Sequence, residues 1–251
     1  MNIWSVAKLF EGIRYTVLSK GFGYFDRLKD VDHSIFMAGT TYNVTEKGNQ
    51  INTYQHWGTK YPLHVTVNIF YSGNSAFSFK IEVTEKQSGE LLMSSALTFV
   101  YVDFRTRKPA QFPDWYFEAK KGKDFGPPMA RLSSPKIPDT AFQFKTKCTY
   151  ADIDFNGHVN QSIYVKWCTD AGTEAALNGH YKNFSHNIGK YPLKSLNLKY
   201  IGEGFVDEIF VINTWQDEND PLILHFGIMK NDKLTLVAKF TYWSAEIGAR
   251  L

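Results

Sequence analysis

Three polar side chains with catalytic potential lie close together in the chain, at Asp154, Asn156 and His158. A carboxylate can take a proton from water, and an imidazole and an amide can orient a water molecule or a carbonyl group. Gly157 stands among them and permits a tight backbone turn. This spacing predicts a site where a carbonyl carbon is attacked, either by an activated water or by Asp154 itself.

The flanking segments predict that the triplet lies on a turn between a strand and a helix. Residues 142–151 have strand-like composition, and residues 160–178 carry apolar side chains along one helical face. The start of a helix presents unpaired N–H groups and the positive end of the helix dipole, which would stabilise an oxyanion. Asp154 and Asn156 also have the residue types that cap helices, so a purely structural role is the alternative.

The same elements occur twice along the chain. Residues 3–19 have the apolar spacing of a helix. Further strands are predicted at 34–45, 50–57, 63–72, 76–85 and 91–103, and then at 193–202, 207–216, 221–229 and 233–246. A curved antiparallel sheet around each helix would bury its apolar face. We therefore expect an α+β fold of two similar units in one chain.

A connector is predicted between the two units. Residues 104–141 hold six of the nine prolines and are expected to lie over the surface. The predicted division is an N-terminal repeat at 1–103, the linker at 104–141 and a C-terminal repeat at 142–251.

The first repeat is expected to lack a site of its own. Met1 and Asn2 align with Val159 and Asn160, so the first repeat has neither a preceding strand nor a polar triplet. We expect either one active site per chain or a chain cut from a longer precursor.

The stretch from Asp152 to Asn160 reads Asp-Ile-Asp-Phe-Asn-Gly-His-Val-Asn, and Tyr164 follows it. It resembles the active-site signature of hotdog-fold thioesterases, and it is most similar to that of the acyl-acyl carrier protein thioesterases, which are double-hotdog proteins. Gln161 departs from the family pattern, which has a second Asn at this position. The end of the first sheet also resembles that family, at 102–103, 107–109 and 113–115.

The resemblance implies a tandem hotdog fold, with two antiparallel sheets each wrapped around a central helix. It also implies a catalytic set of Asp154, Asn156, His158 and an acid after the second helix. Glu203 is the expected acid, with Asp207 and Glu208 as alternatives. In the family the N-terminal repeat shapes the acyl pocket. The expected substrate-binding residues are Asn160, Tyr164, Phe10, Ile13 and Val17.

Composition excludes several other classes of protein. The net charge of +3 is spread along the chain, which argues against a nucleic-acid partner. The only cysteines, Cys148 and Cys168, have no metal-type spacing, so we expect no disulfide framework, metal or cofactor. Cys168 is expected to be a small buried hydrophobe. No apolar run long enough for a membrane span and no signal peptide is seen, which favours an intracellular protein, cytoplasmic or organellar.

The predicted function is hydrolysis of a fatty acyl thioester to a free acid and a thiol. The thioester would be carried by acyl carrier protein or coenzyme A, and a homodimer is left open. Two alternatives remain: a hydratase or dehydratase on the same fold, and a non-catalytic acyl-binding protein. Release of free thiol from acyl thioesters would separate them.

Overall fold

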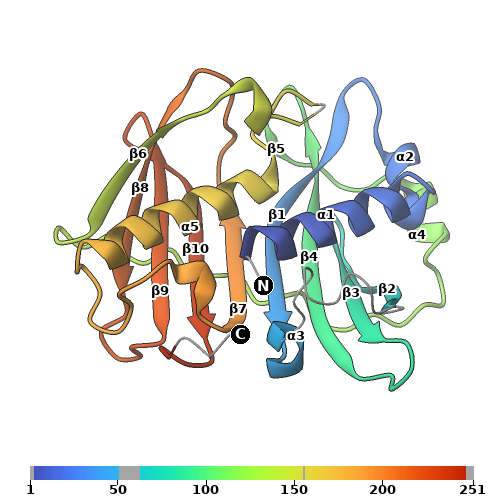
Figure 1. The fold of residues 1–251 in the computed structure, drawn as a ribbon. Helices are drawn as coiled ribbons and strands as arrows, with labels where there is room; N and C mark the ends of the chain where they lie inside the picture. Colours follow the sequence, from blue (N-terminus) through green and yellow to red (C-terminus); the bar gives the residue numbers. More distant parts are fainter. Residues whose placement is uncertain (1–2, 51–62, 155, 247–251) are drawn as a thin grey trace.

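The computed structural model describes residues 3–50, 63–154 and 156–246 of the 251-residue chain. In these ranges, ten strands form one antiparallel sheet, and the two long helices lie against the same face of it (Figure 1). The helices are α1 (Ile3–Leu18), α2 (Phe25–Leu28), α3 (Glu46–Gln50), α4 (Asp114–Glu118) and α5 (Gln161–Leu177), with 3-10 turns at Phe22–Tyr24, Tyr150–Asp152 and Ile188–Lys190.

Strands that precede residue 104 occupy one half of the sheet, and strands that follow residue 141 occupy the other. The first group is β1 (His33–Val44), β2 (Leu63–Ser72), β3 (Ala76–Glu85) and β4 (Leu91–Asp103). The second group is β6 (Phe142–Lys147), β7 (Leu193–Tyr200), β8 (Ile209–Gln216), β9 (Ile223–Lys230) and β10 (Lys233–Tyr242). The order is β2-β3-β4-β1-β7-β10-β9-β8-β6, and the short β5 (Lys108–Pro109) pairs with β4.

The pairing of β1 with β7 joins the two halves. It runs antiparallel from Gly39 opposite Lys199 to Asn43 opposite Ser195. The predicted α+β class with antiparallel pairing is confirmed. The sequence predicts two separate sheets, but the pairing of β1 with β7 joins them into one.

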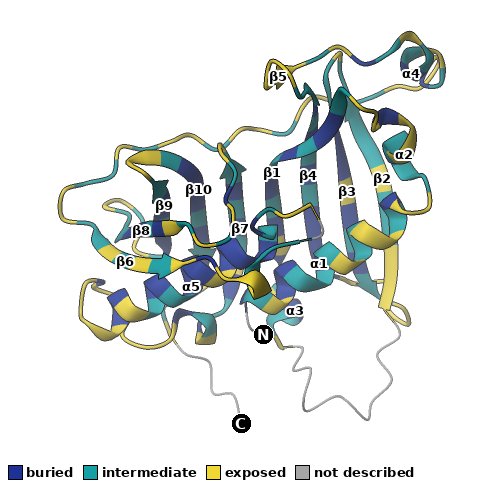
Figure 2. Cartoon of the chain, turned by 90° about the horizontal axis from the view of Figure 1, so that it is seen from above, coloured by how far each residue is buried: buried dark blue, intermediate teal, exposed yellow. Residues whose placement is uncertain are grey.

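The core lies between the sheet and the two long helices, and Figure 2 shows buried residues concentrated on the strands. In β3, strand alternation places Phe77, Phe79 and Ile81 on the inner face, where each is fully buried. In α5, a Cβ at Gly172 would lie 2.6 Å from a methyl carbon of Ile188. Glycine therefore allows α5 to pack closely against its neighbours.

Most predicted elements are present with small changes in their bounds. The strands predicted at 63–72, 76–85 and 91–103 agree with the structure. The strand predicted at 142–151 ends at Lys147, because Thr149 and Asp152 form a reciprocal capping box that starts a 3-10 turn. The strand predicted at 50–57 lies outside the described residues, except that Gln50 ends α3.

The connector at 104–141 is more than a surface segment. Phe112 and Tyr116 are buried, and their rings stack at a centroid distance of 4.2 Å. Phe112 also contacts Phe77 on β3, with ring centroids 6.3 Å apart. Large aromatic side chains bury much apolar area, so this part of the connector completes the core of the first half.

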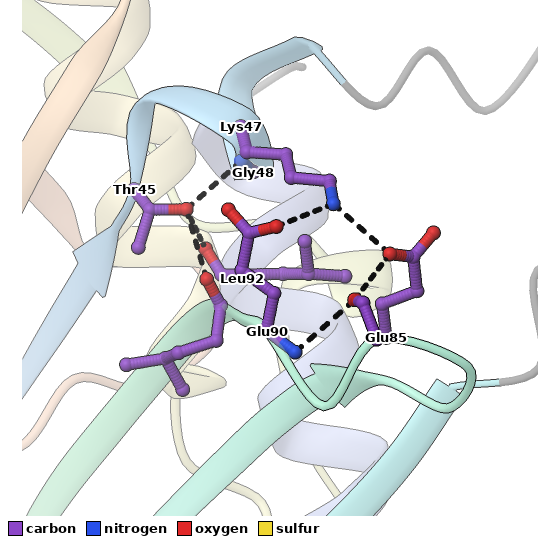
Figure 3. A network of polar contacts seen from close by, with 8 residues as sticks. Thr45, Lys47, Gly48, Glu85, Glu90 and Leu92 are labelled. Carbon is purple, nitrogen blue, oxygen red and sulfur yellow. Dashed lines mark hydrogen bonds and ion pairs between the residues drawn. The ribbon is translucent and has the colours of Figure 1, made fainter.

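A polar network fastens α3 to the hairpin between β3 and β4 (Figure 3). The Thr45 hydroxyl donates to the Leu92 carbonyl at 3.0 Å and accepts the Gly48 N–H at 3.0 Å, as a helix cap does. The Lys47 ammonium bridges Glu85 and Glu90 at 2.9 and 2.6 Å. The network lies away from the polar triplet.

Within the described ranges, no helix is long and apolar enough to cross a membrane.

Candidate active site

The polar triplet lies on a tight turn that precedes α5. Ile153 and Val159 form an isolated antiparallel bridge, and the Asp154 N–H donates to the His158 carbonyl at 2.8 Å. Gly157 has φ +76°, which favours glycine, and its N–H donates to the Asp154 carbonyl at 3.0 Å. Asp154 Oδ1 accepts the Asn156 N–H at 2.8 Å. The turn is therefore held by its own backbone and by one oxygen of Asp154.

Asn160, rather than Asp154 or Asn156, caps α5. Its Oδ1 accepts the N–H of Ser162 at 2.9 Å and the Ser162 hydroxyl at 2.7 Å. Its Nδ2 donates to Glu11 Oε1 on α1 at 2.6 Å. Both the oxygen and the nitrogen of the Asn160 amide are thus hydrogen-bonded. The helix cap that Asp154 or Asn156 could have provided is formed by Asn160.

Glu203 lies beside His158, beyond the end of β7. Its Oε1 is 3.9 Å from His158 Nδ1, and its Oε2 accepts a hydrogen bond from the Arg107 guanidinium. Asp207 pairs instead with Lys147 at 2.8 Å, and Glu208 pairs with Lys230 at 3.0 Å. Of the three acids considered, Glu203 is the one that faces His158.

A cavity of about 930 Å³ connects these groups with the first half of the chain. The second half contributes side chains of the triplet and its surroundings: Asp154, Asn156, His158, Asn160, Tyr164 and Glu203. The first half contributes a group of apolar side chains: Leu18, Phe25, Ile35, Phe36, Met37, Phe99 and Phe104. It also contributes charged and polar ones: Lys8, Glu11, Arg14, Ser19, Asp26, Lys29 and Ser34. The cavity can therefore hold a polar reacting group next to an apolar tail.

The pocket residues predicted on α1 lie elsewhere. Phe10 is buried in the core, where its ring is 5.4 Å from that of Tyr42, and Ile13 packs against the same core. These two residues and Val17 are not among the described residues that line the cavity. The apolar face of an amphipathic helix is the face that packs on the sheet, so α1 presents its polar flank to the cavity, including Glu11.

The sequence does not indicate the charged residues that the first half places at the cavity, among them Glu11 and Arg14 on α1. Burial opposes the ionisation of Glu11, but hydrogen bonds from Asn160 and Lys8 outweigh it, and the pKa of Glu11 is lowered. Arg14 donates to the Gln161 side chain at the start of α5. These contacts join residues almost 150 positions apart in the chain, so no local pattern indicates them.

Burial disfavours ionisation of two tyrosine hydroxyl groups and two cysteine thiol groups around the site. Burial raises the pKa of Tyr164, which lines the cavity, and of Tyr200 on β7. Burial also raises the pKa of Cys148 to about 11 and raises that of Cys168. Because the thiolate is the reactive form, neither thiol is suited to act as the nucleophile. Among the described residues, no group of three or more His, Cys, Asp or Glu is arranged to hold a metal ion.

Comparison with known proteins agrees with this arrangement. Residues 136–245 match the model of the acyl-ACP thioesterase C-terminal domain, a range that contains both the triplet and Glu203. No curated protein sequence matches the chain.

Solved structures similar to this chain include the 12:0-ACP thioesterase from Umbellularia californica, with a TM-score of 0.69 and 18% identity over 96% of this chain and 90% of that one. An acyl-ACP thioesterase from Bacteroides thetaiotaomicron has a TM-score of 0.64 and 15% identity, over 94% of this chain and 87% of that one. At these identities the likeness shows the fold. The predicted double-hotdog class is confirmed, and the match of the C-terminal half confirms the predicted resemblance.

Proposed function

We propose that this protein hydrolyses a fatty acyl thioester to a free acid and a thiol, at one site per chain. The observation that carries the proposal is the shared cavity, whose lining combines Asp154, His158 and Glu203 with apolar side chains from the first half. A fatty acyl thioester needs both kinds of contact, because it has a reactive carbonyl group and an alkyl chain. The family match over residues 136–245 supports the same reaction.

In the proposed mechanism, the thioester carbonyl lies next to the start of α5, where the helix dipole favours negative charge on its oxygen. His158 takes a proton from a water molecule while the water oxygen attacks the carbonyl carbon. The carbon–sulfur bond then breaks, and the proton passes to the departing thiolate. Glu203 orients the imidazole, and its 3.9 Å separation from Nδ1 is expected to shorten when substrate binds.

Asp154 and Asn156 have supporting parts in this scheme. Oδ1 of Asp154 holds the turn, and Oδ2, which has no hydrogen bond to the described residues, can contact the water. Asn156 is exposed at the cavity wall and can donate its amide N–H to the water or to the carbonyl oxygen.

We propose acyl carrier protein as the carrier, because the matching family model belongs to acyl-ACP thioesterases. We also propose that 1–103 and 142–251 are two hotdog repeats joined by 104–141, which the grouping of strands within the sheet supports. The cavity draws on both halves of one chain, so the reaction needs no second copy. Measuring the mass in solution tests the homodimer that the sequence leaves open.

The test is a panel of acyl-acyl carrier protein and acyl-coenzyme A thioesters, with free thiol titrated over time. We expect thiol release by the wild-type protein and its loss in His158→Ala. His64→Ala is the matched control, because His64 is exposed on β2 and is not among the cavity residues. Alkene formation from a hydroxyacyl thioester without thiol release would instead indicate a dehydratase. Saturable binding without turnover would indicate an acyl-binding protein.

A further inference from the structure

Lys230, the last residue of β9, holds the loop that carries Glu203. Its ammonium group donates to the Glu203 backbone carbonyl at 2.8 Å and to both carboxylate oxygens of Glu208 at 3.0 Å. Glu208 Oε2 also accepts the Phe205 N–H at 2.8 Å. Lys230 and Glu208 therefore hold the backbone of this loop at two points, the Glu203 carbonyl and the Phe205 N–H.

Lys230 and Glu208 both contact Phe205, which in turn contacts His158. The Phe205 ring meets the His158 ring edge to face, with centroids 5.1 Å apart and an interplanar angle of 89°. The Lys230 ammonium is 5.4 Å from the centroid of the Phe205 ring, within range of a cation–π interaction. Phe205 thus contacts both the lysine and the imidazole.

The pair lies outside the large cavity, although Lys230 lines a smaller one of about 380 Å³ next to Gly202 and Glu203. Lys230 and Glu208 are not among the described residues that line the large cavity. Their side chains are only 21% and 28% exposed, so the pair is largely shielded from water. Removing one partner would leave the other charge poorly compensated and release the loop.

We infer that Lys230 and Glu208 are positioning residues, which hold Glu203 and, through Phe205, His158 in the reactive arrangement. The inference deepens the proposed thioester hydrolysis and rests on it. A displacement of about 1 Å at reacting groups can cost about 100-fold in rate. The substrate contacts in the large cavity are untouched by the pair, so binding should change little.

The test compares Lys230→Met and Glu208→Gln with Lys147→Met. Lys147 forms an ion pair of 2.8 Å with Asp207 on the same loop, and this pair is 59% and 65% exposed. Within the described part of the chain, it forms no hydrogen bond, ion pair or ring contact with Phe205 or His158. Both members of the inferred pair should show kcat lowered about 10- to 100-fold with KM within about twofold. Lys147→Met should keep both constants near those of the wild type.

Histidine NMR gives a readout that does not depend on turnover. The Phe205 ring shifts the signals of the adjacent His158 ring, so these signals should move in Lys230→Met and stay in place in Lys147→Met. A kcat within threefold of wild type in both Lys230→Met and Glu208→Gln, or unmoved His158 signals, would overturn the inference.

Thermal unfolding shows whether each variant folds. If Lys230→Met or Glu208→Gln does not fold, the kinetic constants of the other variant decide whether the inference holds. If the wild-type protein releases no thiol, the proposed hydrolysis fails. The His158 signals then decide whether the pair positions the imidazole.

Discussion

Replacing Gly204 by alanine should both destabilise the protein and disturb the site. An added Cβ would lie 2.6 Å from Phe210 Cζ, 2.7 Å from Val159 Cγ2 and 3.0 Å from the Tyr164 hydroxyl. Two of these distances are shorter than real Cβ contacts allow, so the loop or its neighbours must move. Overpacking of this kind costs about 1–3 kcal/mol.

The same change should lower turnover, because Gly204 directly links the loop to the catalytic turn. Its carbonyl accepts the Val159 N–H at 2.8 Å, one residue after His158, and Glu203 precedes it in the chain. A shift forced on Gly204 is therefore passed to both sides of the His158–Glu203 pair. We expect kcat to fall about 10-fold or more, by the same sensitivity to displacement as above.

Chemical denaturation and thermal unfolding measure the first effect, and thiol release measures the second. For a chain of this size, about 2 kcal/mol corresponds to a Tm lower by about 4–8 °C. Gly12→Ala is the matched control for stability, because Gly12 lies within α1 and nothing is within 4 Å of its added Cβ. It should raise stability by up to about 1 kcal/mol. A Gly204→Ala variant as stable and as active as wild type would refute the packing argument.

Three further predictions concern single side chains. Asp154→Asn should remove most thiol release while far-UV circular dichroism and Tm stay close to wild type; near-normal hydrolysis would contradict its assigned role. Gly157→Ala should cost about 1–2 kcal/mol in denaturant unfolding, because φ +76° strains any side chain while nothing lies within 4 Å of the new Cβ; an unchanged midpoint would contradict this. The hydrogen bond from His225 holds the pKa of Asp217 at about 2, below its usual 3.8, so Asp217 stabilises the fold above about pH 4 and this contribution is lost as pH falls through 2. Asp217→Asn should therefore lower the unfolding free energy by about 2 kcal/mol at pH 7 and by much less near pH 2, and a difference independent of pH would contradict this.

The sequence was a good guide wherever the signal is local. Runs rich in Val, Thr, Ile, Phe and Tyr, separated by Asn, Gly and Ser, predict β2, β3 and β4 with the bounds that the structure has, because these side chains favour strands and the separating residues favour turns. The triplet and its turn were visible because all of their residues lie within one short stretch. Glu203 could be placed only among three acids, since nothing local distinguishes an acid that faces His158 from one that pairs with a lysine.

Features that depend on distant contacts could not be predicted. The apolar face of α1 suggests pocket residues, but that face packs on the sheet, and the cavity runs along the polar flank. The prolines of the connector indicated a surface segment and gave no sign that Phe112 and Tyr116 would be buried. Arg107 meets Glu203 across 96 positions of sequence, which no periodicity encodes.

The strand pair β1–β7 has a consequence for how the chain is made. During synthesis β1 emerges long before β7, and at about 5–20 residues per second the delay is on the order of 10 s. In that interval the edge of β1 that β7 later covers has unpaired N–H and C=O groups, which are a template for wrong pairing with other chains. We expect the newly made first half to depend on chaperones or low concentration until β7 closes this edge, and the isolated first half to aggregate when produced alone.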